Sequence, residues 1–291
     1  MKPIRSFLFV PGHKEKWVEK IPTFGADAVI LDLEDSVPSN LKPAARGIAR
    51  EAIAELAAAG QRIWVRVNPT PYIYDLDDLE AVIQPGLEGI LLSKPGGPDS
   101  IKTIDAIVSD FELRKGLPIG HTLLIPTLET AKSIELAYPI ALEPRVATLA
   151  APSAKNGDVA RAVGYQWTPE GLESLHLKSK AILAVRAAGK DYPLGGLWQD
   201  VHDLEGLRNS CMFHRQLGFT GEFVLHPSNV AVVNDVYTPD ESEIAYYRGM
   251  VETFAAAEQE GRAAVIYDGE HIDYAHVKTA QQILAMVDDL K

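Results

Sequence analysis

Eight short apolar segments recur along roughly the first 230 residues, and each is followed by a segment with helical periodicity. The apolar segments are centred on Phe7, Val29, Ile63, Ile90, Leu123, Val146, Leu194 and Val224. Continuous apolar runs are typical of parallel strands that helices cover on both faces. Eight such repeats predict an α/β fold, a (β/α)8 TIM barrel of about 250 residues. An open doubly wound sheet is the alternative, but no Gly-x-Gly-x-x-Gly motif follows any predicted strand.

The pattern changes after residue 238. Residues 239–260 read as one long helix, residues 263–269 as a short extended segment, and residues 273–290 as a final helix. This stretch is not needed to close a barrel. We therefore predict a catalytic barrel over residues 1–238 and a C-terminal helical extension over residues 239–291. We expect the extension to act as a lid on a barrel mouth, its own or a neighbour's.

Charge and composition narrow the class of partner. The formal net charge is −12, which argues against nucleic acid because a protein that binds a phosphate backbone needs a basic face. The one cysteine, Cys211, excludes an intramolecular disulfide and suits a reducing cytosol. We find no signal peptide and no run of about 18 apolar residues that could span a bilayer. We therefore expect a cytoplasmic protein that acts on a small molecule.

Two carboxylates follow neighbouring predicted strands. Glu129 ends the apolar strand that begins at His121, and Asp158 follows the strand at residues 145–151. One or two protein carboxylates usually hold Mg²⁺, while water and substrate oxygens complete its coordination. The pair therefore indicates an open metal site. Acids at strand-to-helix turns also cap helices, and capping is the competing interpretation.

Other polar residues gather at the predicted C-terminal ends of strands, where barrel enzymes build their sites. They are Asp32, Glu34 and Asp35 after the second strand, Arg66 in the third and Lys94 after the fourth. Arg66 alternates with two valines, so it points inward, where it needs an acid such as Asp32 or Glu34. We expect its guanidinium to bind a carboxylate or an enolate oxygen, with a structural ion pair as the alternative. For Lys94, a Schiff-base role competes with a solvated or salt-bridged lysine.

Several motifs resemble, in order and spacing, the HpcH/HpaI aldolase and citrate lyase β-subunit (CitE-like) family. They are RSFLFVPG at 5–12, GADAVILDLEDSV at 25–37, VRVNP at 65–69, ETA at 129–131, TPEG at 168–171, LGFTG at 217–221, HPS at 226–228 and VNDVYTP at 233–239. The resemblance covers nearly the whole chain. Its motifs are specific for the family and much less so for the substrate.

The resemblance implies a (β/α)8 barrel that uses Mg²⁺ to cleave or form carbon–carbon bonds of 3-hydroxyacyl-CoA or related thioesters. It implies that Glu129 and Asp158 bind the metal and that Arg66 contacts the substrate. The segment DGEHID at 268–273 resembles the family's DGxxID segment. In the malyl-CoA and citramalyl-CoA lyase branch, its second aspartate is the acid/base, often donated across a subunit boundary, and here that residue is Asp273. Asp273 also fits an N-cap of the final helix, and both roles stay open.

Two loops depart from the family pattern. Gly157 stands where the family has a glutamate before Asp158, and residues 95–97 are Pro-Gly-Gly where a Val-Glu pair is usual. We expect these loops to alter the substrate pocket, and with it the acyl group and the dependence on CoA.

We therefore predict a Mg²⁺-dependent carbon–carbon lyase that acts on a 3-hydroxyacyl-CoA, such as malyl-CoA or citramalyl-CoA, through a thioester enolate. The predicted catalytic residues are Arg66, Asp273 and Glu34, and the predicted substrate-binding residues are Arg66, Asp32, Asp35 and Lys94. We expect a homo-oligomer, a trimer or a hexamer. The alternatives are a CoA-independent 2-oxoacid aldolase, a CoA thioesterase and a non-catalytic ligand-binding subunit.

Overall fold

The structure is a computed structural model that describes residues 1–290. The chain divides into two compact units, one over Pro3–Tyr237 and one that starts at Thr238. In the described residues, no helix is both long enough and apolar enough to cross a membrane.

Seven regular parallel strands form the sheet of the first unit. They are β1 (Ser6–Pro11), β2 (Ala28–Asp32), β3 (Ile63–Val67), β4 (Leu87–Leu92), β5 (Leu123–Pro126), β6 (Leu194–Gly195) and β7 (Gly221–Val224). Their order in the sheet is β5-β4-β3-β2-β1-β7-β6. Consecutive strands are neighbours from β1 to β5, and β7 pairs with β1, so the sheet curls around towards closure.

The predicted sixth strand, at residues 145–151, closes the ring as an irregular segment. Isolated parallel bridges join Val146 to Leu124 and Ala150 to Thr127 on the β5 side, and Ala150 to Leu194 of β6. The ladder is interrupted because Pro126, the last residue of β5, has no backbone N–H to donate. The predicted (β/α)8 barrel is thus confirmed, although its sixth strand is joined to its neighbours only by isolated β-bridges.

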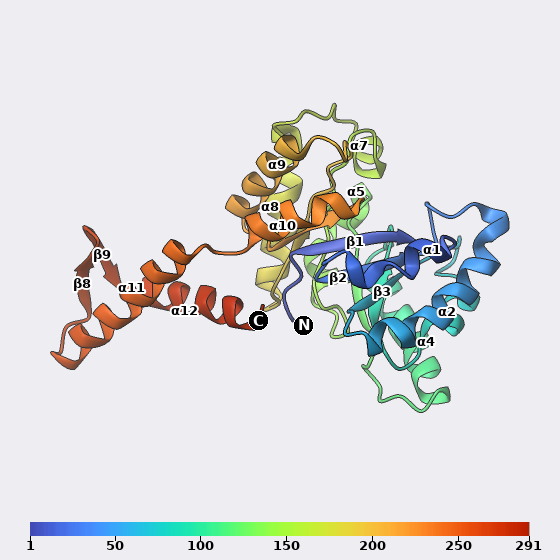
Figure 1. Cartoon of the computed structure of the whole chain (residues 1–291), viewed down its shortest axis with the longest axis horizontal. Coiled ribbons are helices and arrows are strands. Elements are labelled where there is room, and N and C mark those ends of the chain that lie inside the picture. Colours follow the sequence, from blue (N-terminus) through green and yellow to red (C-terminus); the bar gives the residue numbers. More distant parts are fainter. Residues whose placement is uncertain (291) are drawn as a thin grey trace. The chain divides into compact units, whose positions relative to one another are not determined.

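Helices of the first unit lie around the outside of the strands (Figure 1). The α-helices are α1 (Glu15–Val18), α2 (Lys42–Ala58), α3 (Leu76–Val82), α4 (Pro98–Arg114), α5 (Ala131–Glu135), α6 (Ala137–Ala141), α7 (Asp158–Val163), α8 (Leu175–Ala187), α9 (Leu204–Leu217) and α10 (Pro227–Tyr237). Short 3-10 turns are η1 (Ile21–Thr23), η2 (Ser39–Leu41) and η3 (Leu172–Ser174). Cys211 of α9 is buried, and burial raises the pKa of its thiol, as expected for an inert core residue.

Alternate residues of each strand enter two separate cores. Ile30 and Trp64 belong to a cluster inside the barrel, whereas Leu31 and Val65 belong to a cluster between strands and helices. Because side chains alternate along a strand, the position two residues after each inner residue is also inner. Asp32 and Arg66 therefore enter the barrel interior at its C-terminal end.

The second unit has its own small core. It contains α11 (Glu241–Gln259), the antiparallel strands β8 (Ala264–Tyr267) and β9 (Glu270–Asp273), and α12 (Tyr274–Asp289) (Figure 1). Met250, Phe254 and Ile272 are among its buried residues. The sequence pattern indicated only one extended segment here, at residues 263–269. The second strand follows the hairpin signal Asp268-Gly269, where both residues have positive φ, as a type I′ turn requires.

Gly89 of β4 offers a test of how tightly the barrel interior is packed. A Cβ there would lie 2.2 Å from Cζ3 of Trp64 and 2.6 Å from the carbonyl oxygen of Leu123. We expect Gly89→Ala to lower the free energy of unfolding by about 3 kcal/mol, because ring and backbone must both move. Gly47 of α2 has open space around it, so Gly47→Ala is expected to stabilise by about 0.5–1 kcal/mol. Urea unfolding measures both, and equal effects would contradict this packing.

Candidate functional site

Arg66 and Asp32 form the central contact of the site. They are direct register partners on β3 and β2. Nε and Nη2 of Arg66 each donate to one carboxylate oxygen of Asp32, both at 2.7 Å. Burial pushes the pKa of Asp32 up, but the bonds and charge of Arg66 outweigh it and hold the pKa below its ordinary value. The ion pair that we predicted from the inward position of Arg66 is thus present, and it is bidentate.

Further contacts fix the same guanidinium. Nη1 of Arg66 lies 3.0 Å from Oε2 of Glu34 and 3.9 Å from Oδ2 of Asp35. The Arg66 guanidinium carbon is 4.8 Å from the centre of the Phe9 ring. The Arg66 side chain is only 13% exposed, so its orientation is set by protein contacts on several sides.

Glu34 is held by Ser93 and, through it, by Tyr74, and neither residue was among the predicted site residues. The Ser93 hydroxyl donates to Oε1 of Glu34 at 2.9 Å, and the Tyr74 hydroxyl donates to the Ser93 carbonyl at 2.8 Å. Burial raises the pKa of Glu34 despite the nearby Arg66 charge. Ser93 had a signal, since it lies at the end of a predicted strand. Tyr74 had none, because only the folded chain brings it there.

Lys94 is salt-bridged to three acids. Its Nζ lies 3.2 Å from Oδ2 of Asp158, 3.6 Å from Oε1 of Glu34 and 4.0 Å from Oδ2 of Asp35. Burial lowers the pKa of Lys94, but these acids reverse the effect and raise it overall. A Schiff-base lysine needs a lowered pKa, so the arrangement contradicts that interpretation and supports the salt-bridged one.

Neither expected metal ligand acts as a helix N-cap. The N-cap of α5 is Thr130, whose hydroxyl accepts from Ser133 N, and the N-cap of α7 is Gly157. Asp158 is the first residue of α7, and its second oxygen pairs with Arg161 one turn on. The capping interpretation is therefore wrong for Glu129, and Asp158 belongs only to an acidic first turn.

Among the carboxylates of the site, Glu129 has the fewest contacts with other polar groups. It makes no hydrogen bond or ion pair with any residue of the described chain, although it is partly buried. Burial raises its pKa to about 8, against the opposing charge of Arg66. The negative charges of Glu34 and Asp158 contribute to the rise, so these acids interact with Glu129 electrostatically.

The charge balance of the site suits a divalent cation. The set consists of the acids Asp32, Glu34, Asp35, Glu129 and Asp158 and the cations Arg66, Lys94 and Arg161. Its net charge is −2 when every group is ionised. Within residues 1–290, no three or more His, Cys, Asp or Glu side chains are grouped to hold a metal alone. Two carboxylate ligands with other positions left for water and substrate fit Mg²⁺.

A cavity of about 250 Å³ lies beside these residues. Asp32, Arg66 and Glu129 line its polar side, while its apolar lining includes Phe9 and Trp17. Its volume suits a small acid, and it is too small for a whole cofactor. The largely buried Arg66 and the unpaired carboxyl group of Glu129 thus line the same cavity.

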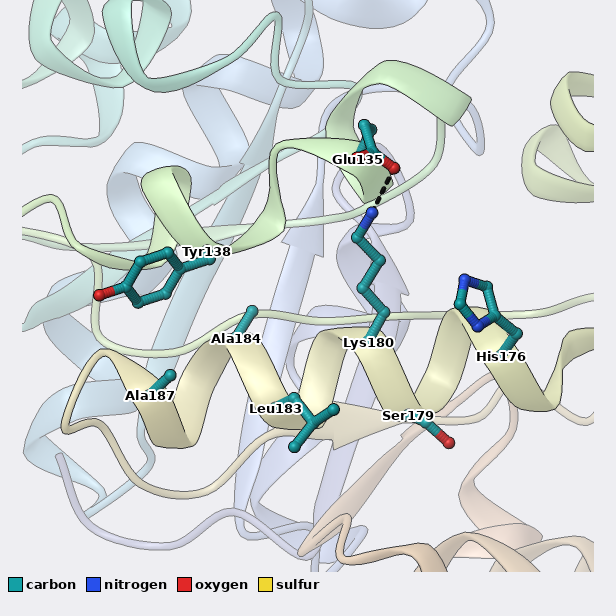
Figure 2. A pocket seen from close by; sticks show the side chains of 8 residues that line it. All are labelled: Glu135, Tyr138, His176, Ser179, Lys180, Leu183, Ala184 and Ala187. Atoms are coloured by element: carbon teal, nitrogen blue, oxygen red, sulfur yellow. Dashed lines mark hydrogen bonds and ion pairs between the residues drawn. The ribbon is translucent and has the colours of Figure 1, made fainter.

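A second hollow, of about 310 Å³, lies between the segment containing α5 and α6 and the helix α8 (Figure 2). Lys180 and Glu135 form an ion pair across it, and Tyr138 and Leu183 lie beside that pair. None of its lining residues belongs to the strand-end set. In a barrel fold the chemistry belongs at the strand ends, so this hollow is not the candidate site.

Asp273 lies in the second unit, where it caps α12. Its side chain accepts from Ala275 N at 2.9 Å, and Asp273 N donates to Nδ1 of His276. Nδ1 of His276 also lies 2.7 Å from Oδ1 of Asp273, and this side-chain contact holds the pKa of Asp273 below its ordinary value. The capping interpretation is confirmed, and a catalytic role for Asp273 stays a prediction.

The sequence profile of the HpcH/HpaI aldolase/citrate lyase family matches residues 5–227. The chain therefore belongs to this family, as its motifs predicted.

Two relatives and one solved structure show what this chain is similar to. A (3S)-malyl-CoA thioesterase of Cereibacter sphaeroides is 32% identical over 284 residues, which cover 97% of this chain and 94% of that protein. An L-malyl-CoA/beta-methylmalyl-CoA lyase of the same organism is 31% identical, with the same two coverages. The crystal structure of CitE from Mycobacterium tuberculosis with magnesium, acetoacetate and coenzyme A matches with a TM-score of 0.76 at 24% identity, covering 99% of this chain and 98% of that one. At this identity, the structural match confirms the fold.

The Asp32–Arg66 pair predicts a pH-dependent stability. We expect Asp32→Asn to lower the free energy of unfolding by about 3 kcal/mol at pH 7, because the buried guanidinium loses its charged partner. Since folding lowers the pKa of Asp32, its contribution is complete above the ordinary value near 3.8 and is lost as the pH falls through the folded-state pKa. The difference in the free energy of unfolding between the wild type and Asp32→Asn, measured with urea, should therefore be smaller at pH 3 than at pH 7. A difference independent of pH would contradict the assignment. Asp191→Asn, at an exposed ion pair, is the control and should change little.

Proposed function

We propose that this protein is a Mg²⁺-dependent carbon–carbon lyase that cleaves or forms a 3-hydroxyacyl-CoA such as malyl-CoA or citramalyl-CoA. The observation that carries the proposal is that Arg66 and Glu129 both line one cavity at the strand ends. The family assignment and the likeness to a malyl-CoA lyase support the same reaction class.

Glu129 and Asp158 are the proposed ligands of the metal. Both are hard oxygen donors, and Glu129 has no competing hydrogen bond in the described chain. The M. tuberculosis structure of this fold was solved with magnesium. When bound, Mg²⁺ supplies a Lewis acid that polarises substrate oxygens.

Arg66 is proposed to stabilise the thioester enolate. Cleavage transfers the proton of the 3-hydroxyl group to a base and turns that group into a carbonyl, while the electrons of the broken carbon–carbon bond form the enolate, which then takes up a proton at carbon. A guanidinium that is held in place beside a cavity stabilises this developing charge without reorganising. Asp32 fixes the fork of Arg66, and Glu34 and Asp35 limit its movement on the other side. We also propose Asp35 and Lys94 as contacts of the substrate's polar groups.

A neighbouring hollow supports a thioester over a free acid. This hollow, of about 280 Å³, shares Phe9, Trp17 and Leu225 with the cavity at the strand ends and also has Lys20 in its lining. Trp17 is 54% exposed, which is unusual for so large an apolar side chain. An acyl group in the first cavity and a pantetheine arm over Trp17 would use both hollows. A free 2-oxoacid would use only the first.

A thioesterase is the second candidate, because a (3S)-malyl-CoA thioesterase is 32% identical to this chain. The two reactions differ in their products. A lyase releases an acyl-CoA and a 2-oxoacid, whereas a thioesterase releases free CoA thiol and the hydroxy acid. Assaying the 2-oxoacid and the thiol in parallel on malyl-CoA separates them, and thiol release alone would reject the lyase.

Glu129→Gln tests the metal site. We expect it to abolish Mg²⁺ binding and to lower kcat/KM for malyl-CoA by at least about 100-fold, because a ligand carboxylate is lost. Calorimetric titration with Mg²⁺ and a 2-oxoacid assay measure the two effects. Glu135→Gln, on the hollow of Figure 2, is the control and should retain both. Retained Mg²⁺ binding and activity in Glu129→Gln would reject the assignment.

Asp273→Asn separates proton transfer from helix capping. We propose that Asp273 moves the proton at the enolate carbon, in its own barrel or in that of a neighbouring subunit of a homo-oligomer. Asparagine caps a helix as well as aspartate does but cannot transfer the proton. We therefore expect Asp273→Asn to keep the melting temperature while kcat falls by about 100-fold or more. Asp273→Ala should lower both, and full activity in Asp273→Asn would leave Asp273 with the capping role alone.

A further inference from the structure

Lys94 has a backbone conformation that its own side chain does not favour. Two residues after the end of β4, its φ is 50°, in the left-handed region. Few residues with a Cβ adopt this region, and the ring of Pro95 restricts Lys94 further. Such strain persists where the surrounding structure imposes it, and it is frequent at functional sites. The position of the ammonium gives a reason for it here.

The ammonium of Lys94 contacts three acids. It lies 3.2 Å from Oδ2 of Asp158, 3.6 Å from Oε1 of Glu34 and 4.0 Å from Oδ2 of Asp35. Oδ1 of Asp158 pairs with Arg161. Both oxygens of this proposed metal ligand are therefore engaged by side-chain cations.

We propose that the Lys94 ammonium competes with Mg²⁺ for Asp158 and thereby sets the metal affinity of the site. The inference rests on the proposed function, because it requires Asp158 to be a metal ligand. Two cations at one carboxylate oxygen repel each other, so the ammonium must move away when the metal binds. Glu34 and Asp35 already lie within 4.0 Å of it and can receive it.

The competition has a consequence for the order of binding. While the ammonium is bound to Asp158, it lowers the affinity of the site for Mg²⁺. A bound substrate carboxylate adds negative charge and raises that affinity again. Mg²⁺ sites with few protein ligands commonly use substrate oxygens in this way. Lys94, displaced towards Glu34 and Asp35, would then also face the incoming carboxylate. Metal and substrate are therefore expected to bind with positive coupling.

Arg161 provides the matched control. It pairs with the same carboxylate as Lys94, but its side chain is 74% exposed, whereas that of Lys94 is 30% exposed. Solvent screens the charge of an exposed side chain, and exposed ion pairs contribute little. The two cations thus differ in burial while they share one partner.

The test is calorimetric titration of the full chain with Mg²⁺ alone. Lys94→Met keeps the length of the side chain and removes its charge, and we expect it to tighten the Kd by about tenfold, which corresponds to about 1.4 kcal/mol. Arg161→Met should stay within about twofold of the wild type. Glu129→Gln should not bind. Circular dichroism and melting temperature establish that each variant is folded.

The outcomes separate this inference from the proposed function. If neither the wild type nor Lys94→Met binds Mg²⁺, the proposed metal site itself is wrong. If the wild type binds and Glu129→Gln does not, but Lys94→Met binds no more tightly than the wild type, only the competition is rejected. Should Lys94→Met fail to fold, Lys94→Gln carries the same expectation, and its unchanged or weaker affinity is equally decisive.

Discussion

The two-pronged contact between Arg66 and Asp32 is the interaction on which the rest of the site depends. An arginine inside a barrel is tolerated only with a charged, hydrogen-bonded partner. Register supplies that partner, because Asp32 lies directly opposite on the next strand. Once two edges of the guanidinium are held, its remaining nitrogen can only face Glu34 and the cavity. The orientation of the cation therefore follows from strand pairing and does not depend on flexible loops.

This pair could be predicted from the sequence because it depends on a local rule. Alternation along a strand places Arg66 inward, and the next strand ends in acids. The contacts of Ser93 and Tyr74 with Glu34 could not be predicted in this way, since they join residues that only the closed barrel brings together. The left-handed backbone of Lys94 was equally hidden, because residues with a Cβ rarely adopt it.

The same division applies to the fold. The eight repeats could be predicted because apolar periodicity reports burial directly. The irregular sixth stave depends on Pro126, whose missing N–H is visible in the sequence but whose bonding partner is not. Capping residues decide a related question. Thr130 and Gly157 are the N-cap residues beside Glu129 and Asp158. Neither carboxylate is therefore needed to cap a helix.

Some charged groups of the site are held by several protein contacts, and others have no bonding partner. Both kinds are useful for catalysis and binding. Arg66 is held on three sides, so it can stabilise charge without paying to reorganise. Glu129 has the opposite character, since it has no bonding partner in the described chain and its pKa is raised to about 8 by burial. A folded protein tolerates such a group at a cost in stability, because ionising it inside the protein is unfavourable. A divalent ion would remove that cost by supplying the missing countercharge. Because Glu129 lies beside a rigid cation and has no bonding partner in the described chain, its position favours a role in binding a ligand.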